Sequence, residues 1–266
     1  MVKQIPYNKI RKILKKKPLI EAIFELRWQL SELKSGAKMD RHYRLLIGRI
    51  YEMVKKDYPS HEPLSSANLP DEMAGHIVQH RFRKDKDKWP LVQIGPGIIT
   101  LNDTESYSWD DFIGRIKKLL KALFETYPKA DKNLKISSLL LRYIDSVEFN
   151  FSEDNIFNFL SDELKIRMNL YDELFKKTGV SKFPLGFNLS FLFSSKKPKG
   201  AVHLRFSRGK RNNKDALIWE EIVQSIEKDV PKTIEKIVKW SEDAHNLTGY
   251  WFFKMLEGSE LIRRFE

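Results

Sequence analysis

Cysteine is absent from the 266 residues of the sequence. This absence excludes a disulfide framework, a thiolate zinc site and a cysteine nucleophile. Long hydrophobic runs are also absent, because no apolar stretch approaches the roughly 20 residues that span a bilayer. The basic N-terminus has too few apolar residues to form the hydrophobic part of a secretory signal. Together these features predict a mature cytoplasmic protein.

Motifs for catalysis and for cofactor binding are equally scarce. The sequence has no Gly-x-Ser-x-Gly elbow, and Gly95-Pro96-Gly97 matches neither a P-loop nor a dinucleotide fingerprint. Glu32-Leu33-Lys34 and Glu163-Leu164-Lys165 have the spacing of a metal-dependent nuclease, but neither has an acidic partner placed upstream on a hairpin. We therefore expect no catalytic residue, no cofactor and no metal site. A small metal-dependent nuclease or toxin is the enzymatic alternative.

The net charge of +12 is concentrated in two segments that contain no acidic residue. Residues 1–17 contain seven basic residues, namely Lys3, Lys9, Arg11, Lys12, Lys15, Lys16 and Lys17. Residues 196–214 contain eight, namely Lys196, Lys197, Lys199, Arg205, Arg208, Lys210, Arg211 and Lys214. Subtracting these 15 from the 48 Lys and Arg leaves 33 against 36 Asp and Glu, so the rest of the chain is almost neutral. Such clustering favours a polyanionic partner.

The periodicity of the first half predicts alternating strands and helices. A short basic helix is expected at 9–17 and ends at Pro18, and two amphipathic helices are expected at 40–57 and from Ser108 onward. Strands are expected at 19–30, 75–83, 90–101 and 135–149, where apolar residues recur with period 2. This order, β-α-β-β-α-β, predicts a ferredoxin-like unit.

The second half predicts an antiparallel sheet followed by helices. A helix capped by Ser152 runs to about Leu164. Strands are expected at 183–194, around residues 202–206 and at 216–223, with Val202, Leu204 and Phe206 facing the core. A helix over 230–246 and a short helix pair from Trp251 to Phe265 complete the chain. We expect an α+β fold with its most natural division at 150/151, giving domains at 1–150 and 151–266.

The second basic segment forms a hairpin in this interpretation. Alternation places Asn188, Ser190, His203, Arg205 and Ser207 on one exposed face, beside Arg208, Lys210 and Arg211. Charge together with neutral hydrogen-bond donors suits phosphate oxygens. The aromatic residues fall at core spacings, so no base-stacking platform is expected. The alternatives are an acidic protein or a membrane surface as the partner, or a solvated face with no partner.

Trp251, Phe252, Phe253 and Leu256 make the C-terminal helical region apolar on all sides. Such residues either dock onto the domain core or bury one face against a partner protein. Both interpretations stay open at this point.

Several strings resemble those of a sporadically distributed family of prokaryotic conserved hypothetical proteins. These strings are Pro18-Leu19-Ile20-Glu21-Ala22, Val92-Gln93-Ile94-Gly95-Pro96-Gly97, Tyr107-Ser108-Trp109-Asp110-Asp111-Phe112 and Leu141-Arg142-Tyr143-Ile144-Asp145. The family commonly has Asn at the position of Asp145, and His245 with the Phe-rich ending is also similar. The resemblance covers most of the chain. It implies an α+β protein of defence-like gene neighbourhoods, with no catalytic residues to transfer.

The length is also similar to that of archaeal proteins that look like the detached N-terminal lobe, with N and linker domains, of a truncated Argonaute. We therefore expect a non-enzymatic subunit that binds a nucleic-acid backbone and completes a partner protein such as a guided nuclease. The nucleic-acid contacts are expected from Lys12, Lys15, Lys16, Lys196, Lys197, Lys199, His203, Arg205, Arg208, Lys210 and Arg211. The partner contacts are expected from Trp251, Phe252 and Phe253. A protein-interaction module of the antitoxin kind is the other non-enzymatic alternative.

Overall fold

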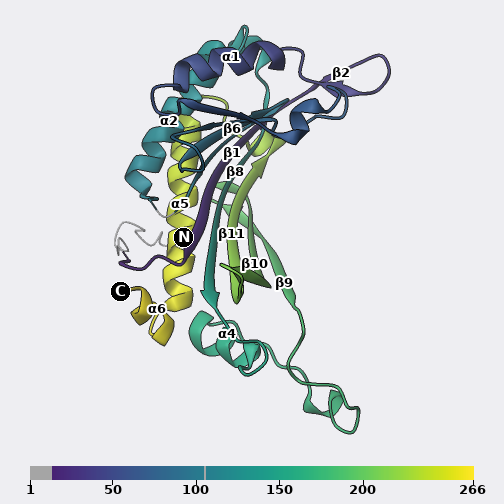
Figure 1. Cartoon of the computed structure of the whole chain (residues 1–266), viewed down its shortest axis with the longest axis vertical. Helices are drawn as coiled ribbons and strands as arrows, with labels where there is room; N and C mark the ends of the chain where they lie inside the picture. Colours follow the sequence, from purple (N-terminus) through teal and green to yellow (C-terminus); the bar gives the residue numbers. More distant parts are fainter. Residues whose placement is uncertain (1–13, 105) are drawn as a thin grey trace.

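One antiparallel sheet of nine strands runs through the computed structural model, which describes residues 14–104 and 106–266 (Figure 1). Its strand order is β4-β5-β6-β7-β1-β8-β11-β10-β9. The strands are β1 (Leu19–Trp28), β4 (Ser60–Pro63), β5 (His80–Arg83), β6 (Leu91–Gly95), β7 (Ile98–Asp103), β8 (Ile136–Glu148), β9 (Asn188–Lys196), β10 (Lys199–Arg211) and β11 (Lys214–Ile226). The strands β2 (Ser31–Glu32) and β3 (Lys38–Met39) form a separate pair.

Helices cover one face of this sheet (Figure 1). They are α1 (Tyr43–Val54), α2 (Trp109–Thr126), α3 (Ala130–Asn133), α4 (Ile156–Leu164), α5 (Ile234–Leu256) and α6 (Glu260–Phe265). The strand β1 shows the consequence of one-sided cover, since Ala22, Phe24 and Leu26 are fully buried while the residues between them are half-buried. The expected α+β fold is confirmed, because helices and a large antiparallel sheet pack as layers.

The buried side chains form two hydrophobic clusters. The first cluster lies between α1, α2, the N-terminal part of α5 and the strands around β1. The second lies between α4, α6, the C-terminal part of α5 and the strands β10 and β11, with Trp219 and Phe206 fully buried in it. Trp251 of α5 packs against both clusters. The helix α5 therefore connects them.

The expected division at 150/151 separates strands that pair with each other. The strand β8 precedes that position and β11 follows it, and the two pair from Glu148 opposite Ala216 to Ser138 opposite Ile226. Each hydrophobic cluster still draws mainly on one side of the division. The two-domain organisation stays a prediction.

Several boundaries differ from the sequence expectation. The strand expected at 75–83 begins only at His80, because His76 has a left-handed backbone (φ 59°) and residues 77–78 cross closely over Gly95. The strand expected at 183–194 begins only at Asn188. Pro184 cannot donate a hydrogen bond to the ladder and Gly186 weakens strand pairing, which explains the late start.

The helical expectations also need correction. Residues 230–246 and 251–256 do not form separate helices, because α5 continues through Gly249 with apolar residues at helical spacing. Asn155, and not Ser152, caps α4, since its side chain accepts hydrogen bonds from the backbone N–H groups of Phe157 and Asn158. Most of the helix expected at 9–17 lies outside the described residues, and residues 14–17 are not helical.

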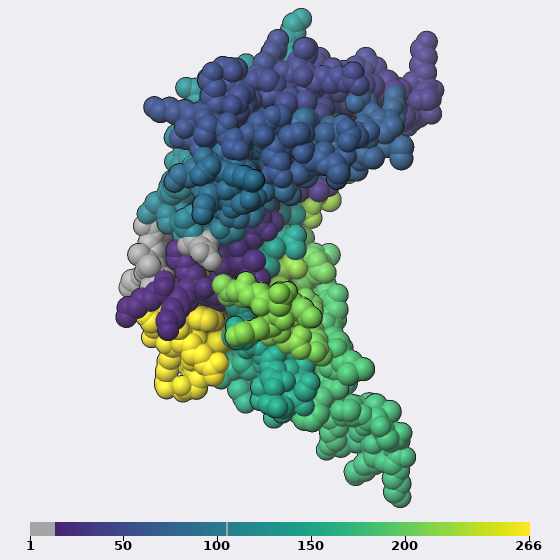
Figure 2. All heavy atoms as spheres, viewed as in Figure 1, coloured from purple at the N-terminus to yellow at the C-terminus, as the bar shows by residue number. Residues whose placement is uncertain are grey.

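Residues 165–187 form a long excursion between α4 and β9. It contains only one short 3-10 turn, Asp172–Leu174, and it projects away from the rest of the molecule (Figures 1 and 2). We call it the 165–187 segment. Among the described helices, none is long and apolar enough to cross a membrane.

Candidate functional site

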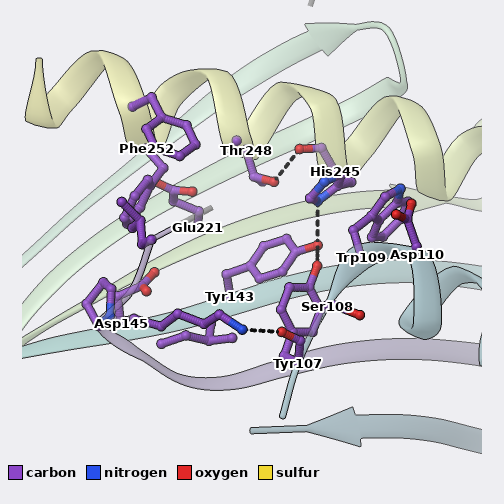
Figure 3. A pocket seen from close by; sticks show the side chains of 16 residues that line it. Tyr107, Ser108, Trp109, Asp110, Tyr143, Asp145, Glu221, His245, Thr248 and Phe252 are labelled. Carbon is purple, nitrogen blue, oxygen red and sulfur yellow. Dashed lines mark hydrogen bonds between the residues drawn. The ribbon is translucent and has the colours of Figure 1, made fainter. Parts of the chain in front are cut away.

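A cavity of about 400 Å³ lies between the helix-covered face of the sheet and the helices α2 and α5 (Figure 3). Five segments far apart in sequence line it: the chain up to the first residue of β1, the start of α2, and neighbouring positions of β8, β11 and α5. Its lining residues are Leu14, Lys17, Pro18, Leu19, Tyr107, Ser108, Trp109, Asp110, Tyr143, Asp145, Glu221, His245, Thr248, Gly249, Phe252 and Phe253.

Strand pairing brings two carboxyl groups to this cavity. Tyr143 and Asp145 are two residues apart on β8, so they share the helix-covered face. On β11, Glu221 pairs with Tyr143 and Trp219 pairs with Asp145. Asp145 and Glu221 are therefore diagonal neighbours on adjacent strands, a relation that places side chains within reach of each other.

A chain of hydrogen bonds forms one wall of the cavity (Figure 3). The hydroxyl groups of Tyr107 and Tyr143 are 2.8 Å apart, and the Tyr143 hydroxyl is 2.9 Å from Nδ1 of His245. The His245 ring stacks on Trp109 with centroids 3.9 Å apart and an interplanar angle of 9°. Lys17 Nζ donates a hydrogen bond of 2.6 Å to the carbonyl oxygen of Tyr107. These contacts fix the wall around the two carboxyl groups.

The two carboxyl groups are buried without protein partners for their charge. Asp145 is 4% exposed and Glu221 is 1% exposed, and Glu221 Oε1 has no hydrogen-bond partner among the described residues. Burial raises the pKa of Asp145 to about 7, although the charge of Arg211 opposes this shift. Burial and then the charge of Asp145 raise the pKa of Glu221 well above its ordinary value. Both carboxyl groups therefore hold their protons more readily than exposed ones, and a positive charge beside them would favour their ionised form.

The expected basic hairpin exists, and its register confirms part of the predicted face. Arg205 pairs with Ser190, Ser207 with Asn188, and His203 with Leu192, so these side chains share the sheet face that the helices leave uncovered. Ser190 Oγ lies 2.6 Å from His203 Nε2. Arg208 has the opposite parity and lies over the ring of Phe151 at 4.7 Å. Arg208, which was expected beside this exposed face, therefore lies on the opposite face of the sheet.

The hairpin also divides the basic residues between its two ends. Lys196, Lys197 and Lys199 lie at the β9–β10 turn, whereas Lys210, Arg211 and Lys214 lie at the β10–β11 turn. The 13 residues of β10 separate these ends by about 40 Å. The segment is one cluster in sequence but two clusters in space.

Acidic residues from other elements partly neutralise both clusters. The ion pairs are Lys197–Asp243 (3.9 Å), Lys199–Asp229 (2.7 Å), Arg205–Glu220 (4.0 Å), Arg208–Asp215 (2.6 Å) and Lys214–Glu148 (3.1 Å). Exposed pairs of this kind contribute only about 0–1 kcal/mol, so the lysines can exchange partners easily. Residues 196–214 contain no acidic residue, so the sequence of this segment alone could not indicate that acidic side chains from elsewhere pair with it.

The other predicted residues lie around the C-terminus. Lys12 is outside the described residues, while Lys15 and Lys16 are exposed. The backbone N–H of Lys16 donates to the carbonyl oxygen of Phe265, which places this segment beside Arg263 and Arg264 on α6. The fold thus places Arg263 and Arg264 beside the C-terminal end of the basic segment at residues 1–17, a neighbourhood that the sequence pattern did not indicate.

The predicted partner residues pack within this chain. Trp251 meets Phe193 edge-on with centroids 5.6 Å apart, and Phe252 stacks on Trp219 at 6.4 Å. Phe252 and Phe253 also line the cavity. All three are half-buried, so a partner role stays a prediction while docking onto the chain's own core is observed.

The two Glu-x-Lys motifs lie in different surroundings. Glu163 Oε2 accepts a hydrogen bond of 2.7 Å from the backbone N–H of Leu261, at the start of α6. Glu32 is exposed in β2. Within residues 14–104 and 106–266, no three His, Cys, Asp or Glu residues are grouped to hold a metal ion.

The cavity itself was missed in the sequence, although one signal was present. The apolar face of the strand at 135–149 reads Leu139, Leu141, Tyr143, Asp145 and Val147, so a carboxylate occupies a core position. Glu221 interrupts the core face of β11 in the same way. A carboxylate at a strand position whose side chain faces the core is the pattern that could have indicated the site.

Three of the four strings that carry the family resemblance meet at this cavity, and the string at residues 92–97 does not reach it. Pro18 and Leu19, Tyr107 to Asp110, and Tyr143 with Asp145 all line it. No protein-family model matches the chain, and no curated protein sequence matches it either. The resemblance and the Argonaute relation stay predictions.

Proposed function

We propose that this protein is a non-enzymatic, cytoplasmic subunit that completes a partner protein and binds the backbone of a nucleic acid. The sharpest form of this proposal is the N-terminal lobe of a truncated Argonaute-type guided nuclease in prokaryotic defence. The observation that carries it is an exposed apolar surface around the 165–187 segment and the edge strand β9.

Large exposed apolar side chains gather in this region. Of the 14 such residues among those described, nine fall between 168 and 193: Met168, Leu170, Tyr171, Leu174, Val180, Phe183, Leu185, Leu192 and Phe193. Leu185 is 93% exposed. The strand β9 is the last strand of the sheet, so its outer backbone groups are available to another strand. Many exposed apolar side chains beside an open sheet edge are typical of a protein interface.

The charge distribution supports the nucleic-acid part of the proposal. Lys196, Lys197 and Lys199 adjoin the open edge at the β9–β10 turn. Lys197 and Lys199 keep 52% and 68% of their side chains exposed despite their ion pairs. A partner seated on β9 would therefore have these cations beside it, where they could contact phosphates that the partner carries.

We also infer a ferredoxin-like unit within the larger sheet. The single strand expected at 90–101 is a hairpin of two strands, β6 and β7, and these take the place of the strands expected at 75–83 and 90–101 in the unit. The chain order β1-α1-β6-β7-α2-β8 and the sheet order β6-β7-β1-β8, with antiparallel pairs, support this inference. The strands β4 and β5 then extend the unit at one edge, and β11, β10 and β9 extend it at the other.

Binding to nucleic acid is expected to be electrostatic and independent of sequence. If about four to six phosphates are contacted, the logarithm of affinity should fall with the logarithm of salt concentration with a slope of roughly −3 to −5. Fluorescence anisotropy with labelled 30-nucleotide single-stranded and double-stranded DNA and RNA across a salt titration measures this slope. A slope near zero would contradict the proposal.

A matched pair of variants locates the contacts. The triple change of Lys196, Lys197 and Lys199 to Ala should weaken binding and make the slope less negative by about 2 to 3. The control changes Lys117, Lys118 and Lys121 to Ala, which removes the same charge from the exposed part of α2. Equal losses in the two variants would show that only net charge matters and that the hairpin is not the site.

Association with the partner protein depends on the apolar surface. Changing Leu174, Leu185 and Leu192 to Ser should weaken a 1:1 complex with a truncated Argonaute-type nuclease of the same genome at least about tenfold. The control changes Leu45, Met53 and Met73, which are comparably exposed elsewhere. Light scattering and titration calorimetry with the purified proteins measure stoichiometry and affinity. An unchanged affinity, or a homodimer that the first variant dissolves, would overturn the heterologous partner.

A further inference from the structure

We propose that the cavity binds a small organic cation, such as an amine, amidine or guanidine with an apolar body. Its cationic nitrogen would lie against Asp145 and Glu221, and its body against Trp109, Phe252 and Phe253. This inference does not depend on the proposed partner or on nucleic-acid binding.

The first argument is that the two carboxyl groups lack hydrogen-bond donors. No hydrogen bond or ion pair to the side-chain carboxyl of Asp145 or Glu221 is found within the described parts of the chain, and Glu221 Oε1 is shielded from solvent without a partner. A buried polar atom without a partner costs about 1–3 kcal/mol, and a charged one costs more. Because both side chains line a cavity of about 400 Å³, a ligand there can supply donors to the carboxyl oxygens that face the cavity.

The second argument is the chemistry of the remaining wall. Leu14, Leu19, Phe252 and Phe253 contribute apolar surface, and Trp109 contributes an aromatic ring. Aromatic faces attract organic cations more strongly when water is excluded. A volume of about 400 Å³ falls at the lower end of the range of small-molecule sites. An organic cation matches both the carboxyl groups and this wall.

Nearby basic groups are engaged elsewhere. The ammonium of Lys17 donates to the carbonyl oxygen of Tyr107. Arg211 donates to Ser146, although its charge acts on Asp145. His245 is hydrogen-bonded to Tyr143 and stacked on Trp109. Of these, Lys17 is the internal cation best placed to compete with a ligand, since it also lines the cavity.

The test compares cations with neutral isosteres of the same shape. Benzamidine is paired with benzamide, and guanidinium is paired with urea, each at concentrations up to about 10 mM. Titration calorimetry and the ¹H–¹⁵N signal of the Trp109 indole report binding at the cavity. Each cation should bind about tenfold or more tightly than its isostere, the factor that a charged hydrogen bond provides.

Two neighbouring residues provide matched variants. Glu221→Gln should reduce benzamidine affinity about tenfold or more. Glu220→Gln makes the same chemical change on the opposite face of β11, where Glu220 pairs with Arg142, and should leave the affinity unchanged. Far-ultraviolet circular dichroism checks that both variants fold.

The outcomes separate the possible occupants. If neither cation binds more tightly than its isostere, or if Glu221→Gln binds benzamidine like the wild type, the proposal is wrong. If cations bind only in Lys17→Met, Lys17 is the resident counterion and the cavity is not a ligand site. Because no arm of this experiment contains nucleic acid or a partner protein, its failure leaves the proposed function intact.

Discussion

The Asp145→Asn protein is expected to be more stable than the wild type at pH 8 by roughly 2 to 4 kcal/mol and equally stable at pH 4. Burial raises the pKa of Asp145 from 3.8 to about 7 in the native state. Between these two values the unfolded chain has released its proton while the native protein retains it. The contribution of Asp145 to stability therefore falls as pH rises from about 4 to about 7 and then levels off. An asparagine has no proton to release, so it removes this loss.

Urea unfolding at pH 4, 6 and 8 measures the effect as a change in the free energy of unfolding. Asp162→Asn is the control, because Asp162 is exposed on α4 and its replacement should change stability by no more than about 0.5 kcal/mol at any of these pH values. The expectation is wrong if, between pH 4 and pH 8, the free energy of unfolding falls no more in the wild type than in Asp145→Asn.

Gly95→Ala is expected to destabilise the protein by more than about 3 kcal/mol. A Cβ atom at Gly95 would lie 1.9 Å from the carbonyl oxygen of Ile77 and 2.9 Å from the Cα atom of Val78. Both neighbours are backbone atoms of a segment held in place, since the adjoining Gln79 N–H donates to Ile94 and the His76 N–H donates to Pro96. No side-chain rotation can relieve the clash, so the backbone crossing must open.

Gly114→Ala makes the same chemical change and is expected to stabilise the protein instead. Gly114 lies inside α2, and a Cβ atom there has nothing within 4 Å. Alanine should stabilise the helix by about 0.5–1 kcal/mol. Urea unfolding of the two variants at one pH compares them directly. If the free energy of unfolding of Gly95→Ala lies within about 1 kcal/mol of the wild-type value, the backbone of residues 77–78 does not cross this close to Gly95.

The sequence predicted which helices and strands form better than it predicted where they begin and which elements they contact. The period-2 pattern located β1, β8 and β10, and the helical pattern located α1 and α2, because each pattern depends on one element burying one face. Starts and ends were less predictable. The late start of β5 depends on the close crossing of residues 77–78 over Gly95. The late start of β9 depends on one residue, Pro184, which has no backbone N–H to donate.

The candidate cavity could not be predicted because it depends on strand register. Glu221 reaches Asp145 only because β11 pairs with β8 with Glu221 opposite Tyr143. His245 reaches Tyr143 only because α5 packs across β8. Likewise, the acidic partners of the basic hairpin come from η4 (Glu227–Asp229), α5, β8 and β11. Charge counts along the chain do not include such long-range neighbours.

The single helix α5 also determines how the molecule comes apart. Its N-terminal turns bury Ile237, Trp240 and Ala244 in the first hydrophobic cluster, and its last turn buries Leu256 in the second. Because helical hydrogen bonds form cooperatively along one backbone, loss of either cluster removes support from the helix that the other needs. We therefore expect the two clusters to unfold as one cooperative unit, because both depend on α5.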